Sequence, residues 1–300
     1  MSQKKITKAV IAAAGFGTRF LPQTKAIPKE MLPLVDKPVI QYVVEELVSV
    51  GVKDIIIVTG YTKRAIEDHF DRPNEELMNN LKQGGPSKVD LLKDVEKIGN
   101  LANFIYVRQK GPYGTATPLM SAEHLLNDEP FFYTWSDDFF KAEPARFQQM
   151  IDAYDKYNCP ILSALKVNND EDYKKYGFAG GKKLDQANIE VSALVEKPGK
   201  EQAPSDLATV SGFLLTPQVF KYFHQVYDVV EKGQEVYAQD ALKLMIEDGH
   251  RLVACEIQNG SYYDIGNKLS YLKAIFDFSL QQPDIRDELK NHLKKKLSEV

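Results

Sequence analysis

The sequence has 300 residues, of which 43% are hydrophobic and 27% are charged, and its formal net charge is -4. This length predicts one large α/β domain with appendages or two domains, and the near-balanced charge excludes a general attraction to nucleic acid or to an anionic membrane. The two cysteines, Cys159 and Cys255, fit neither a disulfide framework nor a zinc-binding pattern, so we expect both to be buried. No apolar stretch reaches membrane-spanning length and the first residues lack the apolar core of a signal peptide, which predicts a cytoplasmic protein.

The first predicted element is a short buried strand at residues 9–14. Its apolar run stops at Gly15 and Gly17, where the backbone can turn tightly because glycine has no Cβ. A P-loop would need a Gly-Lys-Ser/Thr ending, and a dinucleotide-binding loop would need a third glycine at position 20, where this chain has Phe20. The two glycines therefore indicate either a different phosphate-binding loop or an ordinary turn from a strand into a helix.

A basic segment follows the glycine loop. Arg19, Lys25 and Lys29 supply three cations, and Pro22 and Pro28 exclude a regular helix in this stretch. Backbone amides beside several cations favour a phosphate site over a solvated basic turn.

The next segments predict a parallel sheet. Residues 38–50 repeat apolar side chains with a helical period, and residues 54–59 form a continuously apolar strand. A strand, a helix and a second strand in this order form a right-handed crossover unit, whose strands are parallel. A further helix is expected at 61–70, and the polar segment 71–103 is expected to be a helical insertion over the edge of the core.

A second glycine-containing loop and a pair of acids follow the next two predicted strands. The strand at 104–107 leads into a loop at 108–116 and then into a helix that ends near residue 126. The strand at 130–134 ends just before Asp137 and Asp138, at the edge where open α/β sheets bind ligands. Adjacent carboxylates at this edge are candidates for binding a hard divalent cation, and the alternative is a helix N-cap or an Asx-turn.

The second half of the chain also mixes strands and helices. Glu196 and Lys197 end one strand with side chains in alternate directions, so one can face a cleft; a surface charge pair is the alternative. Residues 260–268 are expected to form a polar loop, and the basic tail at 285–300 is expected to be a helix that is solvated or contacts another subunit. The remaining expected elements are helices at 147–157, 217–229, 236–248 and 269–280, and strands at 161–167, 191–196, 209–215 and 251–257.

Several of these motifs, taken in order, resemble those of the sugar-nucleotide pyrophosphorylases. The resemblance covers about residues 8–280, and its most specific stretch is 24–38, which reads TKAIPKEMLPLVDKP. The other pieces are Gly15-Phe-Gly-Thr-Arg19, Gln109 with Gly114, Asp137, Tyr176-Gly177, Glu196-Lys197-Pro198 and Asp264-Ile-Gly-Asn-Lys268.

The resemblance implies an α/β fold with a Rossmann-like nucleotidyltransferase core, in which helices flank a mixed, mostly parallel sheet. It implies a catalytic domain at 1–280, with the insertion at 71–103, and a helical tail at 281–300. The implied reaction is in-line attack of glucose 1-phosphate on the α-phosphate of UTP, giving UDP-glucose and pyrophosphate, with Mg²⁺ as cofactor and a homo-oligomeric enzyme, dimer or tetramer. The sequence shows no evident Ser/His/Asp or Cys/His set, which agrees with a reaction that depends on positioning and charge neutralisation.

The same resemblance implies roles for individual residues. The nucleotide would be held at its base by Ala12, Ala13, Gly15, Gln109 and Gly114, and at its triphosphate by Gly17, Thr18, Arg19 and Lys29. The sugar phosphate would be bound by Asp137, Gly177, Glu196 and Lys197. Magnesium would be shared by Asp137 and Asp264. The catalytic groups would be Arg19, Lys29, Asp137 and Lys197.

The chain departs from the family pattern near some of these positions. Ala12 stands where the family commonly has proline, Trp135-Ser136 replace Leu-Pro, Thr117-Pro118 replace His-Ala, and Gly212 lies in a segment where relatives often carry arginine. A sister enzyme that uses dTTP or another sugar 1-phosphate is therefore an alternative, as is a noncatalytic regulatory relative. A dehydrogenase, supported only by Gly15, Gly17 and Asp36, is the weakest alternative.

Overall fold

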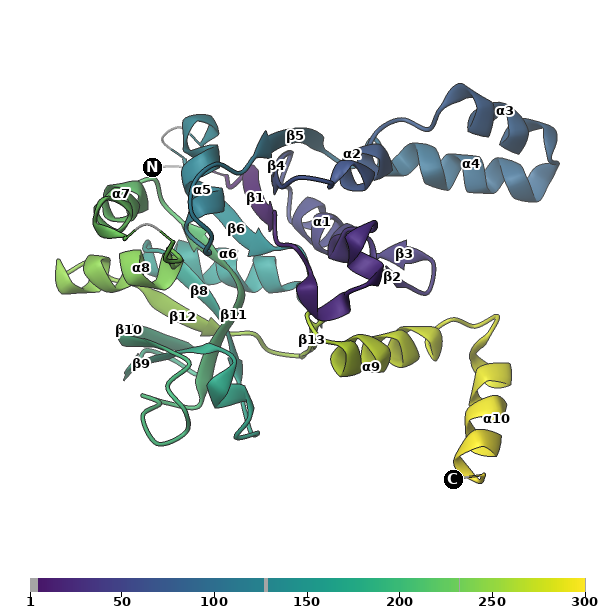
Figure 1. Ribbon diagram of the computed structural model, residues 1–300. Helices are drawn as coiled ribbons and strands as arrows, with labels where there is room; N and C mark the ends of the chain where they lie inside the picture. Colours follow the sequence, from purple (N-terminus) through teal and green to yellow (C-terminus); the bar gives the residue numbers. More distant parts are fainter. Residues whose placement is uncertain (1–4, 127–128, 232, 300) are drawn as a thin grey trace.

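A nine-stranded mixed sheet forms the centre of the part of the chain that this computed structural model describes, residues 5–126, 129–231 and 233–299 (Figure 1). Its strands, in spatial order, are β5 (Asn103–Arg108), β4 (Asp54–Thr59), β1 (Lys8–Ala13), β6 (Phe131–Trp135), β11 (Leu207–Leu215), β8 (Ile161–Lys166), β12 (Val253–Glu256), β10 (Asn188–Glu196) and β9 (Gly177–Lys183). Two smaller pairs are β2 (Pro33–Leu34) with β3 (Lys37–Pro38), and β7 (Asp138–Ala142) with β13 (Gly260–Asp264). The helices are α1 (Val39–Ser49), α2 (Arg64–Phe70), α3 (Glu75–Gln83), α4 (Pro86–Ile98), α5 (Thr117–Ala122), α6 (Arg146–Tyr157), α7 (Val219–Val229), α8 (Ala238–Glu247), α9 (Lys268–Ser279) and α10 (Arg286–Leu297).

Helices cover both faces of the sheet because its central strands are apolar on both sides. In β1, Ile11 belongs to the apolar cluster that includes α1 and α6, whereas the preceding Val10 belongs to the cluster that includes α5, α7 and α8. Burial on two faces explains why β1 and β4 are continuously apolar instead of alternating. Both cysteines are buried, as expected, with exposures of 6% for Cys159 and 3% for Cys255.

The two halves of the sheet differ in strand direction. The neighbours β5, β4, β1 and β6 are all parallel, which confirms the predicted crossover unit, and the mixed sheet of the expected α/β fold is present. Beyond β6, the long strand β11 is antiparallel to β6, β8 and β9, and β10 is antiparallel to β9 and β12. A fourth parallel pair, β8 with β12, lies among these antiparallel strands, so parallel pairing predominates only from β5 to β6 and the sheet as a whole is mixed.

An irregularity in β11 explains one departure from the family pattern. The register of β11 shifts between Thr209 and Phe213, and Gly212 has φ 126°. A Cβ at Gly212 would lie 2.5 Å from the carbonyl oxygen of Tyr133. The backbone here therefore requires glycine, and an arginine would not fit this conformation.

At one place the structure overturns a sequence prediction and also excludes the helix N-cap that was an alternative for Asp138. Residues 260–264, expected in a polar loop, form β13, and Asp138 begins the strand β7 instead of a helix. The two strands pair antiparallel, with Tyr262 opposite Phe140 and Asp264 opposite Asp138. Aromatic packing across this ribbon supplies the β-propensity that the polar composition of the segment concealed. A further strand, β9, was not expected at all.

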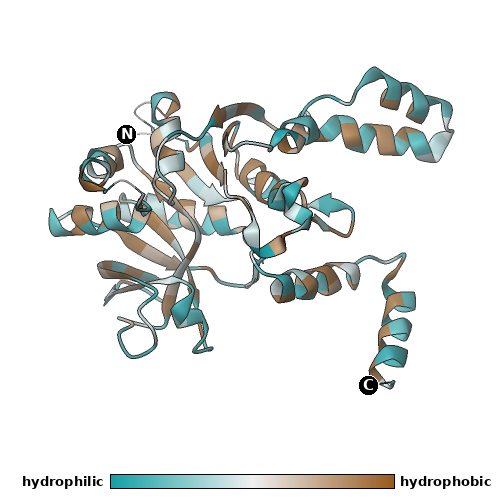
Figure 2. Cartoon of the chain, viewed as in Figure 1, coloured by the Kyte–Doolittle hydropathy of each residue, from teal (hydrophilic) through white to brown (hydrophobic). Residues whose placement is uncertain are grey.

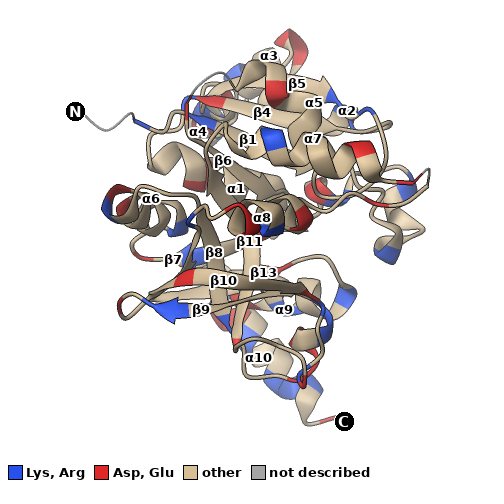
Figure 3. Cartoon of the chain, turned by 90° about the vertical axis from the view of Figure 1, so that its left-hand side faces the viewer, with Lys and Arg blue, Asp and Glu red and all other residues tan. Residues whose placement is uncertain are grey.

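The expected insertion is helical but does not lie over the core. Figure 1 shows α3 and α4 packed on each other and projecting from the sheet. It also shows α10 standing apart at the C-terminal end of the chain. Figure 2 shows mainly hydrophilic residues on these helices, and Figure 3 shows charged residues mainly on helices and loops, with few on the central strands. Among the helices that the structure describes, none is both long and apolar enough to cross a lipid bilayer.

Candidate active site

Two adjoining cavities lie beside the carboxyl ends of β1 and β6. The first, which we call the glycine-loop cavity, has a volume of about 400 Å³, and the second, the β11 cavity, has a volume of about 320 Å³. They share as lining residues Thr115, Trp135, Asp137 and Glu235. Because Asp137 borders both, a group bound in one cavity can meet a group bound in the other beside this carboxylate.

The glycine-loop cavity collects most of the residues expected to bind a nucleotide. Its lining includes Ala12, Gly15, Gly17, Thr18, Lys29, Gln109 and Gly114. Ala13 is not in the lining, because successive strand side chains face opposite ways and its methyl group packs in the core. Tyr113 and Phe16 complete the mouth of the cavity, where their rings form an edge-to-face pair with centroids 5.6 Å apart.

Two glycines keep the walls of this cavity close together. Gly17 has φ 65°, and a Cβ there would lie 3.0 Å from the Cβ of Lys29. Gly114 has φ 124°, and a Cβ there would lie 2.2 Å from the carbonyl oxygen of Val236. Both positions therefore require glycine for the conformation and for the close approach.

Lys29 and Asp137 form an ion pair at the border between the cavities. The distance from Lys29 Nζ to Asp137 Oδ2 is 2.6 Å, and the side chains are 23% and 16% exposed. Burial lowers the pKa of Lys29, whereas the nearby carboxylates, Asp137 first, together raise it by a larger amount. The pKa of Lys29 is therefore above its ordinary value. Lys29 is therefore a charged amine that can exchange a carboxylate partner for a phosphate oxygen.

Arg19 does not line either cavity. Its guanidinium is exposed and donates to the carbonyl oxygen of Gly266 at 3.3 Å. A Cβ at Gly266 would lie 3.4 Å from Arg19 Nη1, 2.9 Å from Asp264 Oδ1 and 3.7 Å from Asp137 Oδ2. Arg19 therefore lies beside the two acids that were expected to bind magnesium, and outside the cavity where it was expected to hold the triphosphate.

Asp137 and Asp264 suit a divalent cation that also binds phosphate. Their carboxylates approach the same point at Gly266, although they lie far apart in the sequence. Among the described residues, no cluster of three or more His, Cys, Asp or Glu side chains could hold a metal ion. Magnesium commonly takes one or two carboxylates and completes its shell with water and substrate phosphates, so this pair of acids fits that ion.

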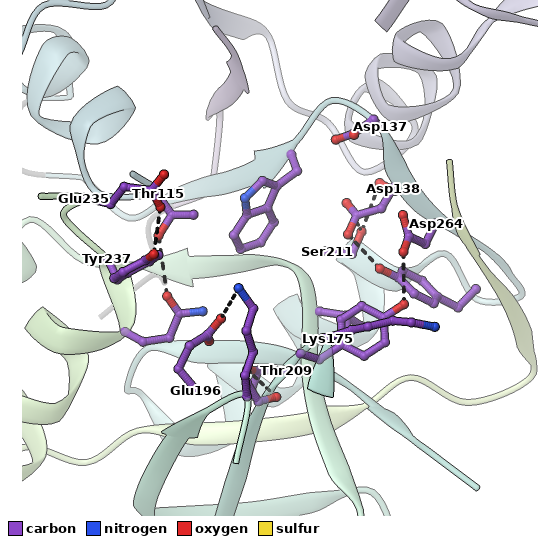
Figure 4. A pocket seen from close by; sticks show the side chains of 17 residues that line it. Thr115, Asp137, Asp138, Lys175, Glu196, Thr209, Ser211, Glu235, Tyr237 and Asp264 are labelled. Carbon is purple, nitrogen blue, oxygen red and sulfur yellow. Dashed lines mark hydrogen bonds and ion pairs between the residues drawn. The ribbon is translucent and has the colours of Figure 1, made fainter. Parts of the chain in front are cut away.

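Neighbouring groups hold the acids in place. Tyr176 donates to Asp264 at 3.1 Å, and the backbone amide of Gly266 donates to it at 2.8 Å. Asp138 accepts from the Tyr262 hydroxyl at 2.8 Å, and burial raises its pKa to about 7. In Figure 4, Asp138 and Asp264 lie on one side of the β11 cavity and Glu196 lies on the other. Asp138 is thus a half-buried neighbour of Asp137 with hydrogen-bond partners of its own.

The β11 cavity contains the residues expected to meet a sugar phosphate. Gly177, Glu196 and Lys197 line it, and Lys197 Nζ lies 3.6 Å from Glu196 Oε1. Glu196 Oε2 is buried and has no hydrogen-bond partner among the described residues, and burial raises the pKa of this carboxyl group. A buried acceptor without a partner that borders a cavity suits a hydroxyl-bearing ligand.

The sequence did not indicate three further residues of this cavity, namely Thr209, Tyr237 and Gln239. Thr209 belongs to β11, and the other two lie at the start of α8, which was expected as a helix without a role. The hydroxyl of Thr115 accepts from the amide of Ala238 at 2.9 Å and so connects α8 to the glycine-loop cavity. Such contacts between segments distant in sequence show that α8 belongs to the site.

Comparison with known proteins gives consistent matches. A family model described as nucleotidyl transferase matches residues 8–280. The chain is 42% identical over 286 residues to a UTP–glucose-1-phosphate uridylyltransferase of Bacillus subtilis, covering 95% of each protein. It is 40% identical over 291 residues to a Staphylococcus epidermidis protein of the same name, covering 97% of this chain and 98% of the relative.

Solved structures show the same similarity. A crystal structure of UDP-glucose pyrophosphorylase complexed with UDP-glucose superposes with a TM-score of 0.81 at 36% identity, covering 92% of this chain and 100% of the other. A UTP-bound enzyme from Acinetobacter baumannii, named UGPase, superposes with a TM-score of 0.85 at 32% identity, covering 96% and 98%.

Proposed function

The chain belongs to the nucleotidyl transferase family, and from this premise we propose that it transfers the uridylyl group of UTP to glucose 1-phosphate, releasing pyrophosphate. The observation that carries the proposal is the shared border of the two cavities at Asp137, with Lys29 on the glycine-loop side and Lys197 on the β11 side. In this arrangement a nucleoside triphosphate and a sugar phosphate can lie side by side, with one lysine available to each.

The nucleotide occupies the glycine-loop cavity. Gln109 offers a donor and an acceptor to the uracil edge, and Gly114 lets the backbone approach the ring. Gly17 and Thr18 present backbone amides to the triphosphate, and Lys29 leaves Asp137 to neutralise phosphate oxygens.

The sugar phosphate occupies the β11 cavity. Glu196 and the backbone at Gly177 meet the sugar hydroxyls, and Lys197 holds the phosphate so that its oxygen faces the α-phosphate of UTP. Asp137 and Asp264 would hold Mg²⁺, which supplies charge neutralisation to the reacting phosphates. No covalent intermediate on the protein is needed, because positioned cations and in-line geometry account for the acceleration.

The experiment that tests this proposal is a coupled assay of pyrophosphate release from UTP, glucose 1-phosphate and Mg²⁺, with chromatography of the nucleotide product. The expected result is UDP-glucose and pyrophosphate in equal amounts, with lower rates for dTTP and for other sugar 1-phosphates. Faster turnover of dTTP would favour the sister enzyme. Tight UTP binding without turnover of any substrate pair would favour the noncatalytic relative.

We also propose that two or more copies of the chain associate through the C-terminal helices. Leu269, Leu272 and Phe276 lie on one face of α9 and are 63%, 50% and 41% exposed, a row that usually marks an interface. The described residues of α10 include none that is buried, and a short helix in water is marginally stable without a packing partner. Analytical ultracentrifugation should give a dimer or tetramer, and Leu272→Glu should shift it toward monomer.

A further inference from the structure

A second ion pair lies directly behind Lys29. Glu30 is fully buried, and Lys63 Nζ lies 2.6 Å from Glu30 Oε2 with only 5% of the lysine side chain exposed. Glu30 belongs to the three-residue 3-10 turn Lys29–Met31, and Lys63 is the N-cap residue of α2. The pair therefore connects the turn that carries Lys29 to a different segment of the chain.

The backbone alone holds this turn weakly. Its own hydrogen bonds are from Met31 N to Pro28 O at 2.9 Å and from Leu32 N to Lys29 O at 3.2 Å. No side chain caps the turn at its start. A 3-10 turn of this length has poor hydrogen-bond geometry, so contacts of its side chains decide its orientation.

Stability by itself is a weak reason for a buried ion pair. Removing two charges from water is costly, and well-packed apolar residues of similar volume are often at least as stable. A buried pair of this kind fixes a geometry more than it adds stability. The place of the pair is informative here, because Lys63 contacts Glu30, and the neighbouring residue, Lys29, pairs with Asp137.

We infer that Glu30 and Lys63 are positioning residues that aim Lys29 at the triphosphate, an inference that rests on the proposed function. Successive side chains of a 3-10 turn point about 120° apart, so anchoring Glu30 inward directs Lys29 outward, toward the border of the cavities. Lys63, Glu30, Lys29 and Asp137 alternate in charge.

The inference is tested with a double-mutant cycle on kcat, using Glu30→Gln in the parent and in a Lys29→Ala background. If Glu30 acts through Lys29, Glu30→Gln lowers kcat about 10- to 100-fold in the parent, the scale of a small misplacement, with KM for UTP nearly unchanged. In the Lys29→Ala background, single-turnover measurement should show a further loss below about 2-fold. An equal loss in both backgrounds would overturn the inference.

A second variant separates positioning from folding. Glu30→Gln with Lys63→Met removes both charges, and kcat is expressed per folded molecule from near-ultraviolet circular dichroism. Reduced kcat in the folded protein supports the inference, and parent kcat in the folded protein overturns it. The matched control is Lys37→Met with Glu45→Gln, which removes a half-exposed 2.6 Å pair outside both cavities and should leave kcat unchanged. The parent rate in the same assay tests the proposed function independently.

Discussion

The two cavities are built in different ways. The glycine-loop cavity is formed by loops that follow parallel strands, and three glycines line it, so that backbone atoms border the cavity. The β11 cavity is formed by antiparallel strands and the start of α8, and it presents the side chains of Glu196, Lys197 and Gln239. Backbone recognition leaves little room for substitution, whereas a cavity lined by side chains can change its preference one residue at a time. We therefore expect the nucleotide side to be rigid in specificity and the sugar side to be adjustable.

The largest effect is expected at the residue that both cavities share. Asp137→Asn should lower kcat at least about 1,000-fold, because it removes a charge that faces the reacting phosphates. The fold should be unaffected, since the amide has the same size and the side chain is partly exposed. Turnover at limiting Mg²⁺ measures the loss of kcat, and circular dichroism measures whether the fold is retained. Parent-like activity would remove Asp137 from the site.

Lys29→Ala tests the glycine-loop side. We expect kcat and kcat/KM to fall together by about 10²- to 10³-fold, because the amine leaves Asp137 to stabilise charge in the transition state. Lys25→Ala, in the same basic segment but outside both cavities, is the control and should have little effect. A rise in the KM for UTP with kcat unchanged would mean that Lys29 contributes only uniform binding.

Gly114→Ala tests the close packing of the glycine-loop cavity against the segment that precedes α8. The residue has φ 124°, and its new Cβ would press on the backbone of Val236. We expect a loss of about 2–3 kcal/mol in the free energy of unfolding, together with weaker UTP binding. Gly85→Ala is a useful control, because it has φ 87° but no atom within 4 Å of the added Cβ. Equal losses for both variants would show that the backbone angle alone matters.

Gln109→Ala is expected to have the smallest of these effects. Loss of its paired donor and acceptor should reduce the preference for UTP over CTP about 10-fold, measured as the ratio of kcat/KM values. The fold should tolerate the change, because the amide side chain lies at the cavity. An unchanged preference would place base recognition on the backbone of the loop alone.

The two cavities also differ in how much of them could be predicted from the sequence, because one depends on local patterns and the other on pairing between distant segments. The buried strand β1, its glycine loop and the parallel unit that follows are local patterns, and they were predicted correctly. The resemblance to sugar-nucleotide pyrophosphorylases was confirmed by the matches to this family. In contrast, β13 and the start of α8 reach the site through pairing with distant segments, and polar composition concealed the strand. Assigning Asp264 to a strand required knowing that Tyr262 faces Phe140.

The division of the substrates between the two cavities is the central claim, and Lys197→Ala tests it most directly. Lys197 lies in the β11 cavity and away from the glycine loop, so the account predicts a higher KM for glucose 1-phosphate. The expected rise is about 10- to 100-fold, from the loss of one charged hydrogen bond, with the KM for UTP unchanged. The measurement is a pair of KM values from the pyrophosphate-release assay, each at saturating concentration of the other substrate. Weakened UTP binding with an unchanged KM for glucose 1-phosphate would contradict the proposed orientation of the substrates.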